Sequence, residues 1–229
     1  MKKNTLRLVR PERLLYKLKE ITVTGFSTFF IDVAMGILTI LFNRQIMIYL
    51  GTNALAVYGV IVNISTFVQC CSYSVGQASQ PIISTNFGAG KGDRIRETLK
   101  YALGTAAFFS LFWTVLSMLM PNVFIRFFMA PTAGVLKIAP SIFRCYGLSF
   151  LLLPLNIFST YYFQALMKPR VAFIASVARG LVISGILIYL LPATFGGNAI
   201  WFAMPITEAA VAFYVVHEMV KYTKQLSTR

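Results

Sequence analysis

The dominant pattern along the chain is a series of long apolar stretches that carry few or no charges. Residues 45–90 contain no Asp, Glu, Lys or Arg, and further apolar stretches follow them. A helix of about 20 apolar residues crosses the roughly 30 Å hydrocarbon core of a bilayer. The pattern therefore predicts an all-α integral membrane protein with six transmembrane helices. The predicted spans cover residues 21–43, 54–84, 99–120, 138–166, 171–191 and 199–220.

Glycine and proline punctuate this pattern between the spans. The residues that mark the connections are Gly51, Pro121, Pro131, Pro192 and Gly196. We expect a basic cytoplasmic linker over residues 1–20, a six-helix transmembrane lobe over residues 21–222 and a cytoplasmic tail over residues 223–229.

The composition agrees with a membrane protein, and the charges set its expected orientation. Hydrophobic residues make up 57% of the 229 residues, and the formal net charge is +14. Most basic residues gather before the first span, after every second span and after the last one, as the positive-inside rule requires. Both termini are therefore predicted to be cytoplasmic. This alternation with the apolar spans argues against nucleic acid as a partner. The clusters after the linker are Lys91, Arg94, Arg96 and Lys100, then Lys168 and Arg170, then Lys221, Lys224 and Arg229.

Prolines fall inside predicted spans, among them Pro81, Pro154 and Pro205. Proline removes a backbone donor and bends a helix. Membrane bundles tolerate this where neighbouring groups satisfy the freed carbonyl. The prolines indicate either simple kinks for packing or a hinge beside a transport site.

The second span carries a polar stripe at helical spacing. Its members follow one another at intervals of three and four residues and so share one helix face. Interhelical hydrogen bonding would explain one or two of them, whereas lining of a water-filled cavity explains the whole stripe. The stripe consists of Asn63, Thr66, Cys70, Tyr73, Gln77, Gln80 and Ser84.

Two acidic residues are predicted to lie near the middle of the bilayer. Asp32 is about eleven residues into the first span, or roughly 16 Å deep at about 1.5 Å per residue. Glu208 enters from the opposite side to a similar depth. A carboxylate at that depth costs about 2.5–3.5 kcal/mol on insertion scales and is a functional candidate. We expect both acids to bind a cation or take up protons. The structural alternatives are a neutral, hydrogen-bonded Asp32 and a bridge from Glu208 to Arg144 or Arg179. Arg179 itself is expected to snorkel or to form a bridge close to the cytoplasmic face.

The sequence gives no support for an enzyme. It has no phosphate-binding loop, no dinucleotide fingerprint and no zinc-protease motif, and it has one histidine, His217. The three cysteines, Cys70, Cys71 and Cys145, show no metal-ligand spacing. We expect no cofactor and no resident metal other than a coupling ion.

Residues 76–91, GQASQPIISTNFGAGK, resemble the signature that ends the second helix of a half in the MATE (multidrug and toxic compound extrusion) transporters. Residues 162–169 and 176–179 resemble the junction of the fourth and fifth helices of such a half. Residues 195–208 resemble its last hairpin. The resemblance covers nearly the whole chain, but only the second of the two six-helix halves that these transporters contain.

The resemblance implies a function and a site. MATE transporters export cationic drugs in exchange for H+ or Na+ across the bacterial plasma membrane. Asp32 falls where many bacterial members carry an acid implicated in cation coupling, so Na+ at Asp32 is one expectation. The acid that several members carry in their tenth helix has no counterpart here, and Asn156 and Gln164 are the polar candidates instead. H+ and Na+ both remain open as the coupling ion.

The expected partners are therefore the lipid bilayer, small organic cations, and either the missing N-terminal half or a second copy of the chain. The expected cavity lining is Asn63, Tyr73, Gln77, Gln80, Asn156 and Gln164. Two alternatives accompany this prediction. One is a flippase for lipid-linked oligosaccharides from the same superfamily, and the other is a membrane scaffold subunit that transports nothing.

Overall fold

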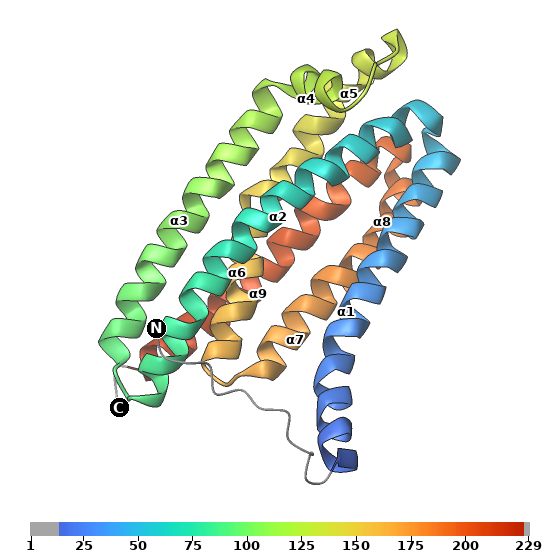
Figure 1. The fold of residues 1–229 in the computed structure, drawn as a ribbon. Helices are drawn as coiled ribbons and strands as arrows, with labels where there is room; N and C mark the ends of the chain where they lie inside the picture. Colours follow the sequence, from blue (N-terminus) through green and yellow to red (C-terminus); the bar gives the residue numbers. More distant parts are fainter. Residues whose placement is uncertain (1–13, 227–229) are drawn as a thin grey trace, which may run out of the picture.

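Helices of membrane length run up and down next to one another (Figure 1). The computed structural model describes residues 14–226, and between residues 14 and 34 it describes the side chains of Leu15, Leu18 and Val33 alone. The α-helices are α1 Leu14–Tyr49, α2 Gly51–Gly88, α3 Gly92–Leu119, α4 Pro121–Phe128, α5 Ala133–Gly147, α6 Leu153–Ala165, α7 Pro169–Val177, α8 Ile183–Phe195 and α9 Ala203–Gln225. Short 3₁₀ turns, η1 Leu148–Leu151 and η3 Gly197–Phe202, precede α6 and α9, and a π-helical turn, η2 Ala178–Val182, joins α7 to α8.

This arrangement confirms the predicted all-helical membrane fold. Five helical stretches of the described chain are long and apolar enough to cross a bilayer, and the apolar part of α1, Met35–Tyr49, adds a shorter helix. No strand occurs within residues 14–226. The five stretches are Gly51–Gly88, Gly92–Leu119, Ala133–Ala165, Pro169–Phe195 and Gly197–Gln225.

The helices depart from the predicted spans in three places. The connection after the third span contains an extra short helix, α4, which begins with Pro121 at its first position and buries Ile125. Proline is favoured there because its missing N–H is not needed in the first turn. The fifth span changes to a π-helical turn at residues 178–182, which the apolar pattern did not indicate. Pro154 lies in the first turn of α6, directly after η1, so the fourth span is interrupted there.

Lysine and arginine gather at one end of the bundle. This end contains the turns α2–α3 and α6–α7 and the last turns of α9. We call it the basic end, and its basic residues are Lys91, Arg94, Arg96, Lys168, Arg170, Lys221 and Lys224. The turns at the opposite end include Gly51 and Gly196, whose positive φ angles favour glycine.

Helix α6 lies at the centre of the bundle, with α2 on one side and α9 on the other (Figure 1). Towards the basic end its aromatic side chains Phe158, Tyr162 and Phe163 are fully buried. Towards the opposite end, a second cluster includes Phe42 of α1 stacked on Tyr58 of α2 at 4.8 Å between ring centroids. Helix α1 packs along α7 and α8, and it diverges from α2 towards the basic end.

The closest approach of α2 to α6 depends on Gly76. A Cβ atom added there would overlap the ring of Tyr161 on α6. We therefore expect Gly76→Ala to destabilise the fold by about 1–3 kcal/mol, the range for overpacking a filled site. The measurement is the free energy of unfolding in a mixed-detergent titration.

Gly59 on the same helix is the matched control, because a Cβ atom there meets nothing within 4 Å. Gly59→Ala should leave the free energy of unfolding unchanged or raise it slightly, since alanine favours helix. Equal losses at both glycines would contradict the close approach of α2 and α6.

Candidate functional site

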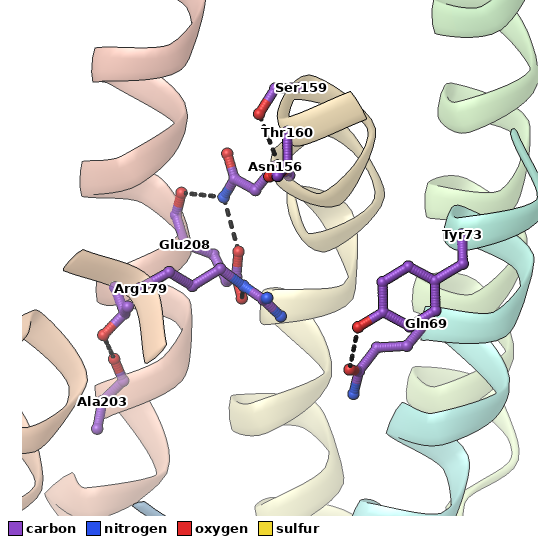
Figure 2. A network of polar contacts seen from close by, with 9 residues as sticks. Gln69, Tyr73, Asn156, Ser159, Thr160, Arg179, Ala203 and Glu208 are labelled. Atoms are coloured by element: carbon purple, nitrogen blue, oxygen red, sulfur yellow. Dashed lines mark hydrogen bonds and ion pairs between the residues drawn. The ribbon is translucent and has the colours of Figure 1, made fainter. Parts of the chain in front are cut away.

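A carboxylate with no solvent exposure lies inside the bundle. Glu208 on α9 is 0% exposed, and its Oε1 accepts a hydrogen bond from Nε of Arg179 at 2.7 Å (Figure 2). Arg179 lies on the π-helical turn η2, and its side chain is 15% exposed. Along their helices both residues are about 15–16 Å from an end of the bundle, which places the pair near mid-depth.

A third helix contributes Asn156 to the same site. The Asn156 amide nitrogen donates to Oε2 of Glu208 at 2.6 Å and to the backbone carbonyl of Glu208 at 2.9 Å. Asn156 is 2% exposed, and its Oδ1 is buried without a hydrogen-bond partner among the described residues. Both carboxylate oxygens of Glu208 therefore have a donor, and α6, η2 and α9 are joined through one side chain (Figure 2).

Irregular helix geometry accompanies this site. Arg179 belongs to a π turn, a form that occurs mostly as single turns and often at functional sites. Gly180, the next residue, lets Met35 of α1 approach, with its sulfur 3.4 Å from the place where a Cβ atom would stand. Asn156 lies in the first turns of α6, just after η1 and Pro154. Arg179 thus lies in an irregular turn and Asn156 lies shortly after one, whereas Glu208 lies within the regular helix α9.

The electrostatics explain why the three side chains stay together. A lone ion in an apolar interior costs several kcal/mol, and a buried pair offsets that cost only when its remaining hydrogen bonds are made. The Arg179 guanidinium supplies the opposite charge, and the Asn156 amide supplies a second donor. Removal of one partner would leave a buried charge uncompensated.

A small cavity of about 130 Å³ adjoins the ion pair. Its wall combines the two charged side chains with apolar residues from α1 and α2 and with further polar groups. Both Thr66 of the polar stripe and Gln69 line it, and Gln69 accepts a long hydrogen bond from the Tyr73 hydroxyl at 3.5 Å. The polar residues of the wall besides the ion pair are Thr39, Tyr58, Ser65, Thr66, Gln69, Tyr146 and Ser149.

The polar stripe of α2 faces away from the other described helices. Six of its seven members are exposed, and Gln80 is partly buried. The Gln80 amide nitrogen donates to Oε1 of Gln164 on α6 at 3.3 Å. Asn63 and Thr66 instead donate to backbone carbonyls one turn earlier on their own helix. The predicted cavity residues thus fall into two places: Asn63, Tyr73, Gln77, Gln80 and Gln164 on this open face, and Asn156 inside the bundle.

The predicted acids have different outcomes. Glu208 lies in a polar site, and of the two arginines weighed for it, Arg179 is the partner, whereas Arg144 on α5 is exposed. Arg179 forms a bridge, which was one of the two expectations for it, and its place relative to the membrane face stays a prediction. The side chain of Asp32 lies outside the described residues, so its coupling role stays a prediction.

Sequence analysis missed the polar wall formed by Ser65 and Gln69 of α2 and by Tyr146 and Ser149. Ser65 and Gln69 are four residues apart and so share a helix face next to the stripe. This spacing could have predicted that they line a common site. Tyr146 lies just before η1 and Ser149 lies within it. The helix is interrupted there, so the two residues follow no helical spacing that could be recognised in the sequence.

Comparison with known families decides the classification. The family model named MatE matches residues 28–190. The chain belongs to the MatE family. No curated protein matches this MatE chain in sequence.

Solved structures share the fold of the MatE chain. A multidrug resistance MATE family transporter of the MOP superfamily in its outward-facing conformation superposes with a TM-score of 0.84 at 19% identity, covering 98% of this chain and 50% of its own. An inward-facing multidrug resistance MATE family transporter superposes with a TM-score of 0.83 at 18% identity, covering 96% of this chain and 50% of its own. A MOP superfamily transporter from Pyrococcus furiosus superposes with a TM-score of 0.82 at 17% identity, covering 95% of this chain and 49% of its own. The chain spans about half the length of these structures.

The buried triad generates a prediction on stability. Arg179→Leu and Glu208→Leu are each expected to cost about 3–5 kcal/mol, because each leaves a buried charge unpaired. The double substitution should cost less than either single one, because it removes both charges. The free energy of unfolding of the four proteins measures the coupling.

Arg144→Leu serves as the control, since this arginine is exposed. Its loss should stay within about 0.5 kcal/mol, as for ordinary surface substitutions. Additive costs of the two single substitutions would contradict the ion pair.

Proposed function

We propose that this chain is one lobe of a secondary transporter that exports cationic drugs or other toxic organic cations in exchange for H+ or Na+. Membership of the MatE family supports the class of protein, and the observation that carries the proposal is the fully buried Glu208 with Arg179 and Asn156. Ionisable groups deep in a membrane bundle are rare and typically serve ion pathways. A purely structural scaffold would not need them.

Glu208 is the proposed coupling carboxylate in the described part of the lobe. In the arrangement seen here Arg179 occupies its Oε1 as an internal counter-ion. A proton or Na+ that binds Glu208 replaces this guanidinium, and the Asn156 side chain keeps the carboxylate in place through Oε2. The orphaned Oδ1 of Asn156 is an oxygen ligand available to Na+. Asp32 is proposed as a second coupling acid on α1, on the strength of its depth in the span.

The open face of α2 is the proposed path of the organic cation. It presents hydroxyl and amide groups, with Tyr73 at 38% exposure, and it borders the cavity beside the ion pair through Thr66. Such a surface solvates a cation with oxygen atoms and aromatic faces without binding it tightly. In a complete transporter this face would meet the other lobe across the central cavity.

Alternating access would come from rocking of the lobe as a rigid body. Its fold matches outward-facing and inward-facing transporters almost equally, with TM-scores of 0.84 and 0.83, which supports a lobe that keeps its shape while its partner moves. One lobe cannot alternate alone. The proposal therefore includes a second lobe, either an N-terminal six-helix half or a second copy. With the basic end inside, the lobe lies in the bacterial plasma membrane with both termini cytoplasmic.

A flippase for pyrophosphate-linked carriers is the second candidate within the superfamily. It would require unneutralised Arg or Lys in the cavity to bind the pyrophosphate. Arg179 is the basic residue of the described wall, and Glu208 neutralises it. The charge of the cavity therefore favours organic cations as cargo.

Dye export tests the proposal. Cells that express the chain from its complete locus are expected to retain less ethidium than cells with an empty vector. Glu208→Gln and Asp32→Asn should each restore retention, because an amide binds neither a proton nor a cation in the way that a carboxylate does. Retention is measured over a range of pH values, with and without Na+ and with and without a protonophore.

Glu218→Gln is the matched control, because Glu218 lies on the same helix at the basic end and contacts Lys221. It should export dye like the parent. Unaltered retention in cells with the parent chain would contradict drug export. Full export by Asp32→Asn at every pH would remove Asp32 from the mechanism while leaving Glu208 in it.

A further inference from the structure

Two grooves on the outside of the bundle flank the last turns of α9. One, of about 690 Å³, lies between α6 and α9. The other, of about 370 Å³, lies between α3 and α9. Both volumes fall within the roughly 300–1,000 Å³ typical of ligand sites. Val220 and Lys224 line both grooves, so the two meet at the end of α9.

Each groove is apolar along its length and cationic at one end. The α6–α9 groove contains Leu155 and Phe213 deeper in the bundle and Lys221 and Lys224 at the basic end. The α3–α9 groove has Leu103 at its deeper part and Arg96 and Lys224 at the same end. No acidic residue lines either groove in the described chain. Glu218 contacts Lys221 at 3.5 Å and Asp93 contacts Arg96 at 3.7 Å, so Lys224 keeps its charge without a carboxylate partner among the described ion pairs.

The length of the larger groove matches one leaflet of a membrane. Ala212 and Lys224 both line it and are twelve residues apart, which is about 18 Å along a helix. Half of a roughly 30 Å hydrocarbon core is about 15 Å. The cations therefore stand at headgroup level, and the apolar part reaches the middle of the bilayer.

From this match of charge and length, we infer that the end of α9 binds one anionic diacyl phospholipid. Its phosphate lies against Lys224 and Arg96, and its two acyl chains occupy the grooves on either side of Val220. Basic pockets between transmembrane helices are known to select anionic headgroups. The inference uses the membrane location and the shape of the grooves, and it does not depend on transport activity.

A third groove offers an internal comparison. It lies along α3, has a volume of about 390 Å³, and is lined by Phe108, Phe112 and other apolar residues without any cation. Acyl chains should occupy it regardless of their headgroup. The difference between the grooves isolates the contribution of the charges.

Tryptophan quenching by lipids with brominated chains tests the site. The full chain carrying Phe213→Trp is placed in phosphatidylcholine vesicles that contain brominated phosphatidylglycerol or, in a parallel series, brominated phosphatidylcholine. Phe213 is 81% exposed and lines the larger groove, so the substitution is tolerable and its signal is local. The parent chain supplies the background from Trp113 and Trp201. We expect phosphatidylglycerol to associate about fivefold more strongly than phosphatidylcholine for each cation that faces the phosphate.

The pair Lys224→Gln and Arg96→Gln should remove this preference, while Phe108→Trp in the cation-free groove should show none. Val216→Trp in the same groove provides a second reporter if Phe213→Trp does not fold. Equal quenching by the two lipids at position 213 would overturn the inference. A preference that survives the loss of both cations would overturn it too, since it would then belong to the basic end in general. An equally strong preference at position 108 would also overturn it, because no cation lines that groove.

Discussion

The arrangement of the lobe depends on one constraint: a carboxylate that no water reaches must find its counter-charge within the bundle. Glu208 meets this constraint with Arg179 and Asn156, and it thereby connects three helical segments that are far apart in sequence. Those segments are also where regular helix gives way, at η1 before Asn156 and at the π turn that holds Arg179. Interrupted backbone at mid-depth is tolerated in membranes only where protein or a cavity surrounds it. The site and the irregular turns therefore require each other.

Periodicity predicted much of this molecule because it follows from the bilayer itself. The long apolar helices and the polar stripe of α2 result from apolar length and helical spacing. The structure has five helical stretches of membrane length, the shorter apolar helix of α1 and the stripe. The partner of Glu208 could not be predicted in this way. Arg144 and Arg179 both lie on neighbouring spans, and which of them faces Glu208 depends on how their helices are rotated. The π turn changes the rotation of the helix that carries Arg179, and no residue type in the sequence predicts such a turn. The extra helix α4 was not predicted, because it is too short for a helical spacing of apolar residues to be recognised.

The stripe of α2 exposes polar groups without a large cost in free energy. Thr66 and Asn63 donate to carbonyls one turn back, so their donors are already satisfied on the open face. Thr39 on α1 does the same with Met35. Unpaired donors in lipid would cost several kcal/mol each. Under the proposed function this surface would meet water, cargo and a partner lobe in turn. Locally satisfied side chains would suit it, because no contact has to be broken when the neighbour changes.

The proposed coupling follows from a property of Arg179 that no pH change alters: a guanidinium does not lose its proton in proteins. In the proposed mechanism the pair is neutral when Glu208 is free of ions, and the open face of α2 beside it would accept an organic cation without repulsion. When a proton or Na+ occupies Glu208, the positive charge of Arg179 is uncompensated, and at mid-depth it repels a second cation strongly. In the proposed mechanism ion and cargo would therefore exclude each other through one charge that is always present. An antiporter requires such exclusion, whereas a channel or a scaffold does not.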